Sequence, residues 1–174
     1  MPIPFSKTNS VATELAYVIN IREAKLLAGT EDVGEIKKYF FEKELAKILV
    51  LKMGPKGALV ITSDGMESLI PVYKTNTVWP IGSGDIFAAV FAFHWFKGAD
   101  VTKAAQEASW QTASYSNNKD FQFTSIDSDP EIKPLTIQKY PLGQVYLAGP
   151  FFTYAERWLV NEIRKSLMDM NLKV

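Results

Sequence analysis

Gly82, Ser83, Gly84 and Asp85 are the residues with the clearest chemical potential, and they stand directly before a long apolar stretch. Two glycines let the backbone turn tightly and present successive N–H groups. The N-terminus of a following helix adds unpaired donors and a partial positive charge. The pattern predicts an anion hole for a phosphoryl group, with the Asp85 carboxylate placed to take a proton from an attacking hydroxyl. The alternative is a glycine-rich turn in which Asp85 stabilises the first helical turn.

Asn20 and Glu23 form a second candidate pair, because Asn20 ends an apolar run and Glu23 follows three residues later. Sheets of the α/β class bind ligands at the carboxyl ends of their strands. Oxygen-bearing side chains placed there would hold a hydrated Mg²⁺ through water. The alternative is that the pair caps a helix.

A third candidate segment contains Lys52, Gly54 and Gly57, which follow the next apolar run. Its form is that of a loop whose backbone approaches a nucleotide. The alternative is a plain hairpin turn between two strands.

Strands and helices alternate around these residues, which is an α/β pattern. The apolar runs predict strands over 15–20, 47–53, 58–62, 69–73 and 144–148. The helical periodicities predict helices over 22–27, 33–44, 86–97, 101–115 and from Thr153 to about Met170. The helix over 86–97 is apolar on nearly every side, which predicts that it is buried. Because the chain has too few other residues to cover such a helix, we infer that it lacks neighbours it would pack against.

Residues 117–143 lose periodicity and are rich in Asn, Asp, Ser and Pro, which indicates a linker or surface excursion. The predicted organisation is therefore a first part over 1–118, a linker over 119–143 and a separate α/β unit over 144–174.

Composition excludes several classes of function. The 174 residues carry 19 basic and 19 acidic side chains, so no charge excess suggests nucleic acid or an anionic membrane as a partner. The chain has no cysteine and one histidine, His94, which lies in the apolar stretch and is interpreted as a core residue. The N-terminus does not have the pattern of a secretory signal, and we expect a cytoplasmic protein.

Three segments together resemble the ribokinase-like (PfkB) carbohydrate kinases over roughly residues 10–118. They are Ala16–Gly29 (AYVINIREAKLLAG), Leu49–Ile61 (LVLKMGPKGALVI) and Gly82–Gly98 (GSGDIFAAVFAFHWFKG). The resemblance is to the C-terminal half of that family. It implies part of a ribokinase-like three-layer α/β/α fold, with residues 101–118 as the helix that flanks the adenine.

The resemblance implies transfer of the γ-phosphoryl group of ATP to a hydroxyl of a sugar or nucleoside. Asp85 would be the general base, and Gly82, Ser83 and Gly84 would form the anion hole. The remaining residues would bind the nucleotide. Asn20 and Glu23 would organise Mg²⁺ and the triphosphate, with Glu23 reaching the metal through water. The nucleotide site would be lined by Lys52, Gly54 and Gly57, and Asn117 or Asn118 would lie near the adenine.

Two departures from the family pattern limit what the resemblance implies. Trp79, Pro80 and Ile81 stand where the family usually has Asp-Thr-Thr, so we do not expect the monovalent cation that many members bind. The family's first half, which supplies the sugar contacts, is absent. The expected partners are therefore a small-molecule substrate together with either that missing half or a second copy of the chain.

The tail has its own resemblance. Residues 145–167 (VYLAGPFFTYAERWLVNEIRKSL) look like the first strand and helix of nucleoside 2-deoxyribosyltransferases. Tyr146, Gly149, Pro150 and Phe152 would then line a nucleoside pocket. The alternative is a strand–helix unit that simply packs on the sheet.

Three hypotheses follow for the whole chain. The first is an enzyme, a kinase module that is incomplete in this chain and belongs to a kinase–deoxyribosyltransferase fusion. The second is a regulatory module that binds nucleotide or sugar without turnover. The third is a structural fragment that associates through its exposed core.

Overall fold

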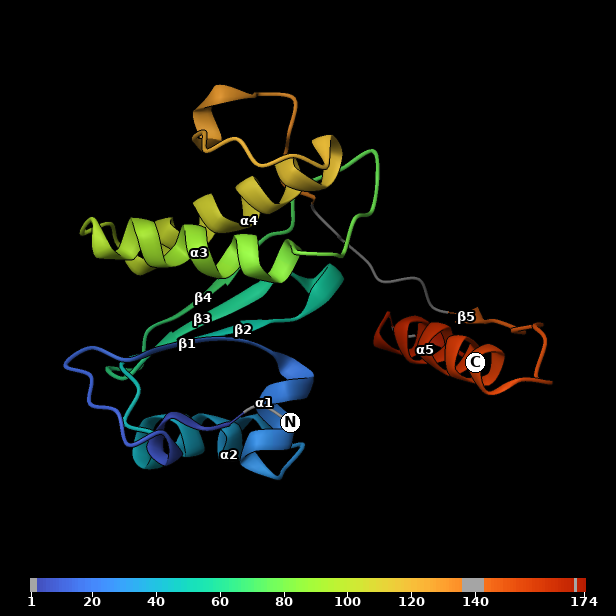
Figure 1. The fold of residues 1–174 in the computed structure, drawn as a ribbon, viewed down its shortest axis with the longest axis horizontal. Helices are drawn as coiled ribbons and strands as arrows, with labels where there is room; N and C mark the ends of the chain where they lie inside the picture. The colour runs from blue at the N-terminus through green and yellow to red at the C-terminus, as the bar shows by residue number, and fades with distance from the viewer. Residues whose placement is uncertain (1–2, 136–142, 171) are drawn as a thin grey trace. The chain divides into compact units, whose positions relative to one another are not determined.

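A four-stranded sheet lies at the centre of the first of two compact units, Met1–Leu135 and Thr136–Val174 (Figure 1). The computed structural model describes residues 3–135, 143–170 and 172–174. The sheet order is β1-β2-β3-β4, formed by Ala16–Asn20, Ile48–Lys52, Ala58–Thr62 and Glu67–Ile70. β1 and β2 are parallel, and β3 and β4 follow as antiparallel hairpin strands.

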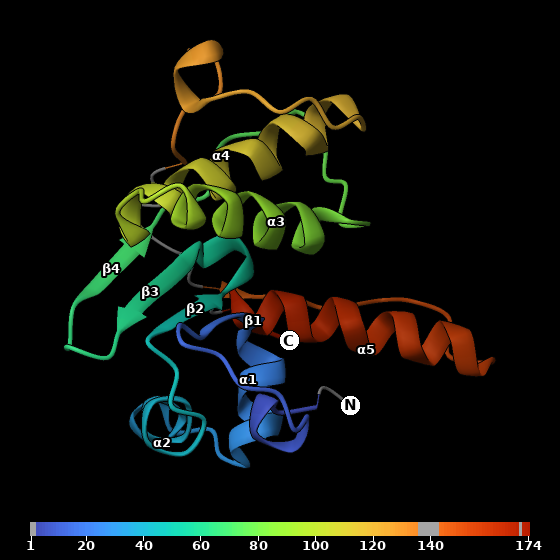
Figure 2. The same cartoon turned by 60° about the vertical axis from the view of Figure 1, so that its left-hand side comes forward.

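Helices cover both faces of this sheet, so the unit has the predicted three-layer α/β/α architecture (Figures 1 and 2). One face carries α1 (Ile21–Ala28), α2 (Val33–Lys38) and a π-helical turn over Tyr39–Lys43. The other carries α3 (Ser83–Phe96) and α4 (Val101–Asn118), which pack against each other.

β2 is the strand that joins the two cores. Leu49 and Leu51 point into the core beneath α1 and α2, whereas Ile48 and Val50 point into the core beneath α3 and α4. All four are buried, because side chains alternate between the two faces of a strand and both faces are covered. The continuous apolar run that predicted this strand follows from that two-sided burial.

The N-terminal turn Phe5–Lys7 is attached to this core through a buried carboxylate. Glu44, only 3% exposed, accepts hydrogen bonds from the Tyr17 hydroxyl (2.6 Å), the Ser6 hydroxyl (2.7 Å) and the Ser6 amide (3.0 Å). The Tyr17 hydroxyl also accepts from the Phe5 amide at 2.7 Å. Burial and the bond to Glu44 raise the pKa of Tyr17, so its hydroxyl remains a donor.

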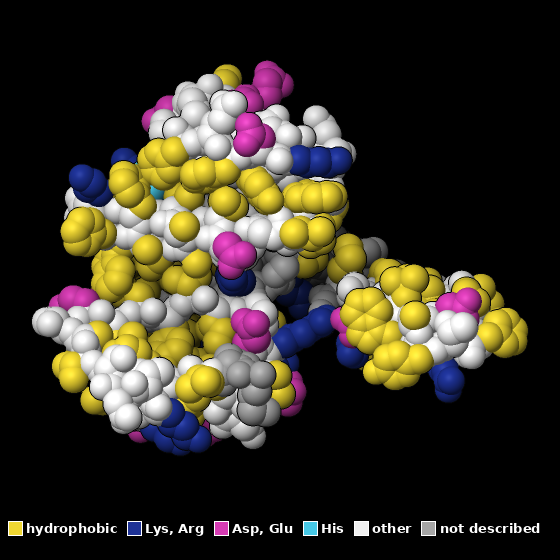
Figure 3. All heavy atoms as spheres, viewed as in Figure 1, with side chains coloured by type: hydrophobic (Ala, Val, Ile, Leu, Met, Phe, Trp, Pro, Cys, Tyr) yellow, Lys and Arg dark blue, Asp and Glu magenta, His cyan; other side chains and the backbone are white. Residues whose placement is uncertain are grey.

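The predicted burial of the helix over 86–97 is wrong for one of its faces. α3 buries Phe87, Val90 and Phe91, but Phe93 is 43% exposed and Phe96 is 87% exposed. Hydrophobic side chains therefore gather along α3 on the surface (Figure 3). The Phe123 ring packs against Phe93, with ring centres 4.7 Å apart, whereas Phe96 stays almost fully exposed.

Residues 119–135, within the predicted linker, pack on α4. Ile132 joins Tyr73, Trp110 and Ala113 in a small buried cluster. The buried Gln111 side chain bonds the Gln122 carbonyl and the Thr124 amide. This part of the segment is therefore attached to the first unit.

The second unit contains β5 (Gly143–Gln144), α5 (Tyr154–Asp169) and β6 (Leu172–Lys173), with β5 and β6 parallel. The predicted strand over 144–148 is thus only a short pairing at its start, and its predicted length is wrong. Thr153 and Glu156 form the predicted capping box of α5. Within the residues described, no helix combines the length and apolar character that crossing a membrane requires.

Candidate active site

The sheet places two predicted site residues side by side. Asn20 and Lys52 are the last residues of the parallel strands β1 and β2 and are partners in the strand register. Lys52 also pairs with Ala58 at the start of β3, so the turn containing Gly54 and Gly57 lies at the same edge. Carboxyl ends of parallel strands are the usual ligand-binding edge of an α/β sheet.

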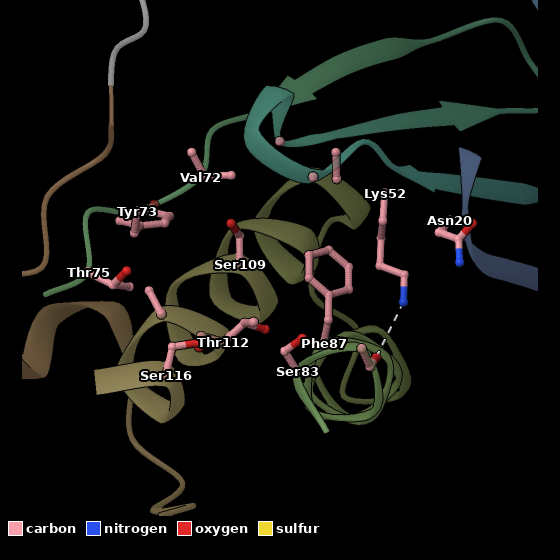
Figure 4. Close-up of a pocket in the computed structure, with 15 residues that line it drawn as sticks. Asn20, Lys52, Val72, Tyr73, Thr75, Ser83, Phe87, Ser109, Thr112 and Ser116 are labelled. Atoms are coloured by element: carbon pink, nitrogen blue, oxygen red, sulfur yellow. Dashed lines mark hydrogen bonds between the residues drawn. The ribbon is translucent and has the colours of Figure 1, made fainter. Parts of the chain in front are cut away.

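An open cavity of about 360 Å³ lies at this edge, between the sheet and the two helices α3 and α4 (Figure 4). Most of its exposed lining is apolar, with a few polar groups, as in small-molecule sites. Its lining includes the predicted residues Asn20, Lys52, Gly54, Gly57, Ser83 and Gly84, together with Tyr73, Thr75, Phe87, Ser109, Thr112 and Ser116.

Lys52 connects the sheet edge to the start of α3. Its Nζ lies 3.5 Å from the Gly84 carbonyl oxygen (Figure 4). Burial lowers the pKa of Lys52, while attraction to Glu23 and Asp85 opposes that shift. Both carboxylates therefore attract this one amine electrostatically. Among the residues that line the cavity, Lys52 is the cation nearest the glycine turn.

Among the described residues, the first turn of α3 has no side-chain cap, in contrast to α1, α2, α4 and α5. Those four helices are capped by the side chains of Asn20, Asp32, Asp100 and Thr153. Its N-cap is Gly82, in the left-handed region at φ +75°. The first-turn N–H groups of α3 thus lack the side-chain acceptor that the other four described α-helices have, which suits them to an anion.

Ser83 and Asp85 complete that first turn. The Ser83 hydroxyl donates to the Pro80 carbonyl at 2.8 Å, which ties the turn to the preceding loop. Asp85 is exposed and carries the first-turn carboxylate. The predicted anion hole and the predicted base are thus on one helical turn, and their catalytic roles stay predictions.

Gly57 is required by the backbone around it. It has φ +87°, and a Cβ at this position would lie 2.0 Å from the Ile70 carbonyl oxygen of β4. No side chain fits there without moving the strand, so the loop after β2 needs glycine at this point.

Asn20 and Glu23 form the capping box that was the alternative interpretation of the pair. The Asn20 Oδ1 accepts from the Glu23 amide at 2.8 Å, and the Glu23 carboxylate accepts from the Asn20 amide at 3.3 Å. The described residues hold no group of three or more His, Asp or Glu side chains able to cage a metal. The donor set present fits a Mg²⁺ held through water, and that role stays a prediction.

At the end of α4, the side chain of Asn117 contacts a neighbouring loop. Asn117 Oδ1 accepts a hydrogen bond from the Asn76 amide at 2.8 Å, so its side chain holds the loop between β4 and α3. Ser116, its neighbour, lines the cavity. The role of Asn117 or Asn118 near an adenine stays a prediction.

Sequence reasoning missed the hydroxyl-bearing face of α4. Ser109, Thr112 and Ser116 line the cavity from successive turns of this helix (Figure 4). Their spacing of three and four residues is the available signal, since such residues share a helical face.

In the second unit, a cavity of about 620 Å³ is lined by residues of the segment before α5 and of α5 itself, including Tyr146, Phe151 and Arg164. Of the four residues predicted to form a nucleoside pocket, Tyr146 lines this cavity. Gly149 packs closely on α5, where an added Cβ would lie 3.0 Å from Val160. Phe152 is 91% exposed and lies outside the lining, as does Pro150.

Comparison with solved structures shows that the fold is that of the ribokinase-like kinases. A putative ribokinase II from E. coli, in complex with ATP and Mg²⁺, superimposes with a TM-score of 0.54 at 24% identity, over 59% of this chain and 33% of that chain. A Burkholderia thailandensis nucleoside kinase in complex with inosine gives a TM-score of 0.50 at 27% identity, over 63% and 35%.

Residues 15–116 match the pfkB family of carbohydrate kinases, and the chain belongs to that family. Among curated proteins it is similar to 5-dehydro-2-deoxygluconokinase from Listeria monocytogenes, with 26% identity over 147 residues. The enzyme of the same name from Shouchella clausii is 25% identical over 149 residues. These matches cover 78% and 79% of this chain but 45% of each relative, so the chain spans less than half the length of these relatives.

Proposed function

We propose that the first unit is the nucleotide-binding and phosphoryl-transferring half of a kinase that acts on a hydroxyl of a sugar or nucleoside. The observation that carries the proposal is the meeting of three groups at one sheet edge. The Lys52 amine comes from the end of β2, whereas the uncapped first turn of α3 and the Asp85 carboxylate come together from one helical turn in a distant segment of the chain. A cation, free amides and a base are what phosphoryl transfer needs.

Each group has a distinct task in this proposal. Lys52 attracts the phosphates, because its charge is held in a desolvated position. The amides after Gly82 stabilise the charge that develops on the transferred group. Asp85 accepts the proton of the substrate hydroxyl while that oxygen bonds to phosphorus and the bond from phosphorus to the ADP oxygen breaks.

The cavity and the sheet edge would hold the two ends of ATP. The apolar lining with Tyr73 and the hydroxyls of α4 fits the base and ribose, and Lys52 lies toward α3. Asn20 and Glu23 would hold Mg²⁺ through water. When bound, Mg²⁺ would neutralise charge on the phosphates.

The acceptor would be a sugar-like molecule with a free hydroxyl. Two findings support this class: the curated relatives named above are 5-dehydro-2-deoxygluconokinases, and the Burkholderia structure is a nucleoside kinase in complex with inosine. Residues that choose among such acceptors would come from the part of the relatives that this chain does not span.

The decisive experiment is titration of ATP with Mg²⁺ into the chain by calorimetry, with Gly82→Val and Asp85→Asn alongside. Gly82→Val should abolish binding, because a branched side chain at φ +75° cannot keep the turn. Asp85→Asn should keep binding, because it removes a base and not a phosphate contact. If the folded parent chain binds no ATP, the proposal fails for this chain in isolation.

A second candidate is binding without turnover. It is favoured by Pro80, which has no backbone N–H to donate just before the glycine turn. It is also favoured by the length of the chain, which covers only 45% of its curated relative. Under this alternative, both the parent chain and Asp85→Asn bind ATP, and neither releases ADP when sugars or nucleosides are added.

For the second unit we propose a surface that binds a nucleoside through aromatic stacking. Tyr146 at the edge of its cavity supports this, since exposed aromatic rings are suited to stack on bases. Titration with a deoxynucleoside should give weak binding that Tyr146→Ala removes. Equal binding by both forms would show that Tyr146 does not bind the nucleoside, and no binding by either form would favour the packing unit.

A further inference from the structure

The last turn of α4 holds the loop that leads into the glycine turn. Three consecutive residues each contribute one hydrogen bond. The Tyr115 hydroxyl donates to the Ile81 carbonyl at 3.0 Å. The Ser116 carbonyl accepts from the Thr77 hydroxyl at 2.6 Å, and the Asn117 side chain accepts from the Asn76 amide at 2.8 Å. In addition, the Lys119 amine lies 5.0 Å from the ring centre of Trp79. The loop is therefore fixed along its length by one helix end.

The contact of Tyr115 is the one nearest the proposed chemistry. Because a peptide group is planar, fixing the Ile81 carbonyl also fixes the amide of Gly82 on the same plane. The same hydroxyl lies 3.0 Å from where a Cβ on Gly82 would be. Tyr115 thus sets the peptide orientation before Gly82 and closes the space beside it.

That orientation decides where the first-turn amides of α3 point. Gly82 is the N-cap of α3, and its carbonyl accepts the Ile86 amide at 2.9 Å. With no side-chain cap to hold the turn from inside, the contacts from α4 and the bond from Ser83 to Pro80 fix it from outside. A rotation of the Ile81–Gly82 peptide would turn the Gly82 amide and change the backbone at the N-cap, from which the first turn of α3 starts.

We propose that Tyr115 is a positioning residue that holds the glycine turn in its anion-binding geometry. The proposal rests on the proposed function of the first unit. Tyr115 does not line the cavity, so it acts through the turn and not by contact with the nucleotide base. The interaction links helix α4, which carries the hydroxyl face of the cavity, to the start of α3, where phosphate would bind.

The test is Tyr115→Phe, which keeps the ring and deletes the hydroxyl. Calorimetry compares the affinity for ATP with Mg²⁺ and for adenosine, and hydrogen exchange follows the amides of residues 82–86 without ligand. We expect about a fivefold loss of ATP affinity, typical of one hydrogen bond, unchanged adenosine affinity and faster exchange in 82–86. Tyr154→Phe, an exposed tyrosine of the second unit, is the matched control and should change nothing.

Unchanged ATP affinity and unchanged exchange in Tyr115→Phe would overturn the inference. Equal losses for ATP and adenosine would also overturn it, since they indicate a general effect on the cavity. If the parent chain binds no ATP, the proposed function fails, whereas the exchange of residues 82–86 still decides whether Tyr115 holds the turn.

Discussion

At the scale of single residues, the most consequential positions are those where the backbone leaves no choice of side chain. Gly57 and Gly82 both have positive φ, and at both a Cβ would meet another part of the chain. Gly57 would meet a backbone oxygen that cannot move freely, whereas Gly82 would meet the end of a side chain. The two glycines should therefore respond differently to substitution.

Gly57→Ala should lower the free energy of unfolding by about 2–4 kcal/mol, because the new Cβ overlaps the Ile70 carbonyl and φ is strained. Gly65→Ala is the matched control, since Gly65 has φ +94° but an added Cβ there meets nothing within 4 Å. That variant should lose only about 1–2 kcal/mol. Urea unfolding of both measures the difference, and equal losses would contradict the contact described here.

Lys52 should give ATP binding a characteristic dependence on pH. The protonated amine attracts phosphate, and burial lowers its pKa below the ordinary value of 10.5. Affinity should therefore fall as the pH rises, and the fall should begin at a lower pH than for an ordinary lysine. In Asp85→Asn the fall should begin lower still, because the lost charge opposed the pKa shift.

Calorimetry over a series of alkaline pH values tests this, with Lys52→Met as the control. That variant should bind ATP weakly and show no such fall. A fall of the same size in Lys52→Met would assign the pH dependence to another group.

At the scale of elements, the buried Glu44 carboxylate connects the N-terminal turn, β1 and the π-helical turn. Burial alone would raise its pKa, but the hydrogen bonds from Tyr17 and Ser6 outweigh burial and lower the pKa below its ordinary value. A lowered pKa in the folded state means that the carboxylate stabilises the fold above its unfolded pKa of about 4.3. This stabilisation is lost as the pH falls through the lower, folded value.

Glu44→Gln should therefore lower the free energy of unfolding by about 1–3 kcal/mol at neutral pH, and by less in acid. Urea unfolding between neutral pH and about pH 3 measures this. Glu42→Gln is the control, since Glu42 is exposed two residues earlier. If the two variants have the same pH profile, the Glu44 bonds do not contribute as described.

Elements were predictable from sequence where one chain segment contains its own signals. β2 has an apolar run that ends at Lys52 and a glycine turn, and α5 has the Thr153–Glu156 capping box. The same holds for part of the site, because Asn20 ends one predicted strand and Lys52 is the last residue but one of the next, and a parallel sheet brings such ends together.

What could not be predicted depends on contacts between distant segments. Tyr115 and Ile81 are 34 residues apart, and neither side chain has a pattern that indicates the contact. The exposure of α3 could be expected from sequence, but the exposed face could not be located, for a related reason. A helix apolar on all sides indicates that it needs cover, but its periodicity does not show which side the chain itself covers.

At the scale of the whole molecule, the exposed apolar face of α3 should govern how the chain behaves in solution. Phe96 is 87% exposed, and Trp95 and Ala92 line a shallow cavity beside it. Contiguous apolar surface of this kind favours association. We expect the parent chain to self-associate with rising concentration and Phe96→Glu to reduce this.

Sedimentation velocity over a concentration series measures the association. Phe152→Glu serves as a matched control, because Phe152 is an equally exposed phenylalanine of the second unit. A parent chain that stays monomeric at every concentration would contradict the prediction. An effect of Phe152→Glu alone would place the association on the second unit.

The position of β1 at the end of the sheet order has a directional consequence. β1 pairs with β2 on one side, so at this end of the sheet a further strand can be added only on the other side of β1, about 4.8 Å away. A fifth strand laid parallel to β1 would bring its last residue beside Asn20, at the mouth of the cavity. An antiparallel strand would bring its first residue there. The polarity of whatever extends this sheet therefore decides whether the site gains a strand end or a strand beginning as its next wall.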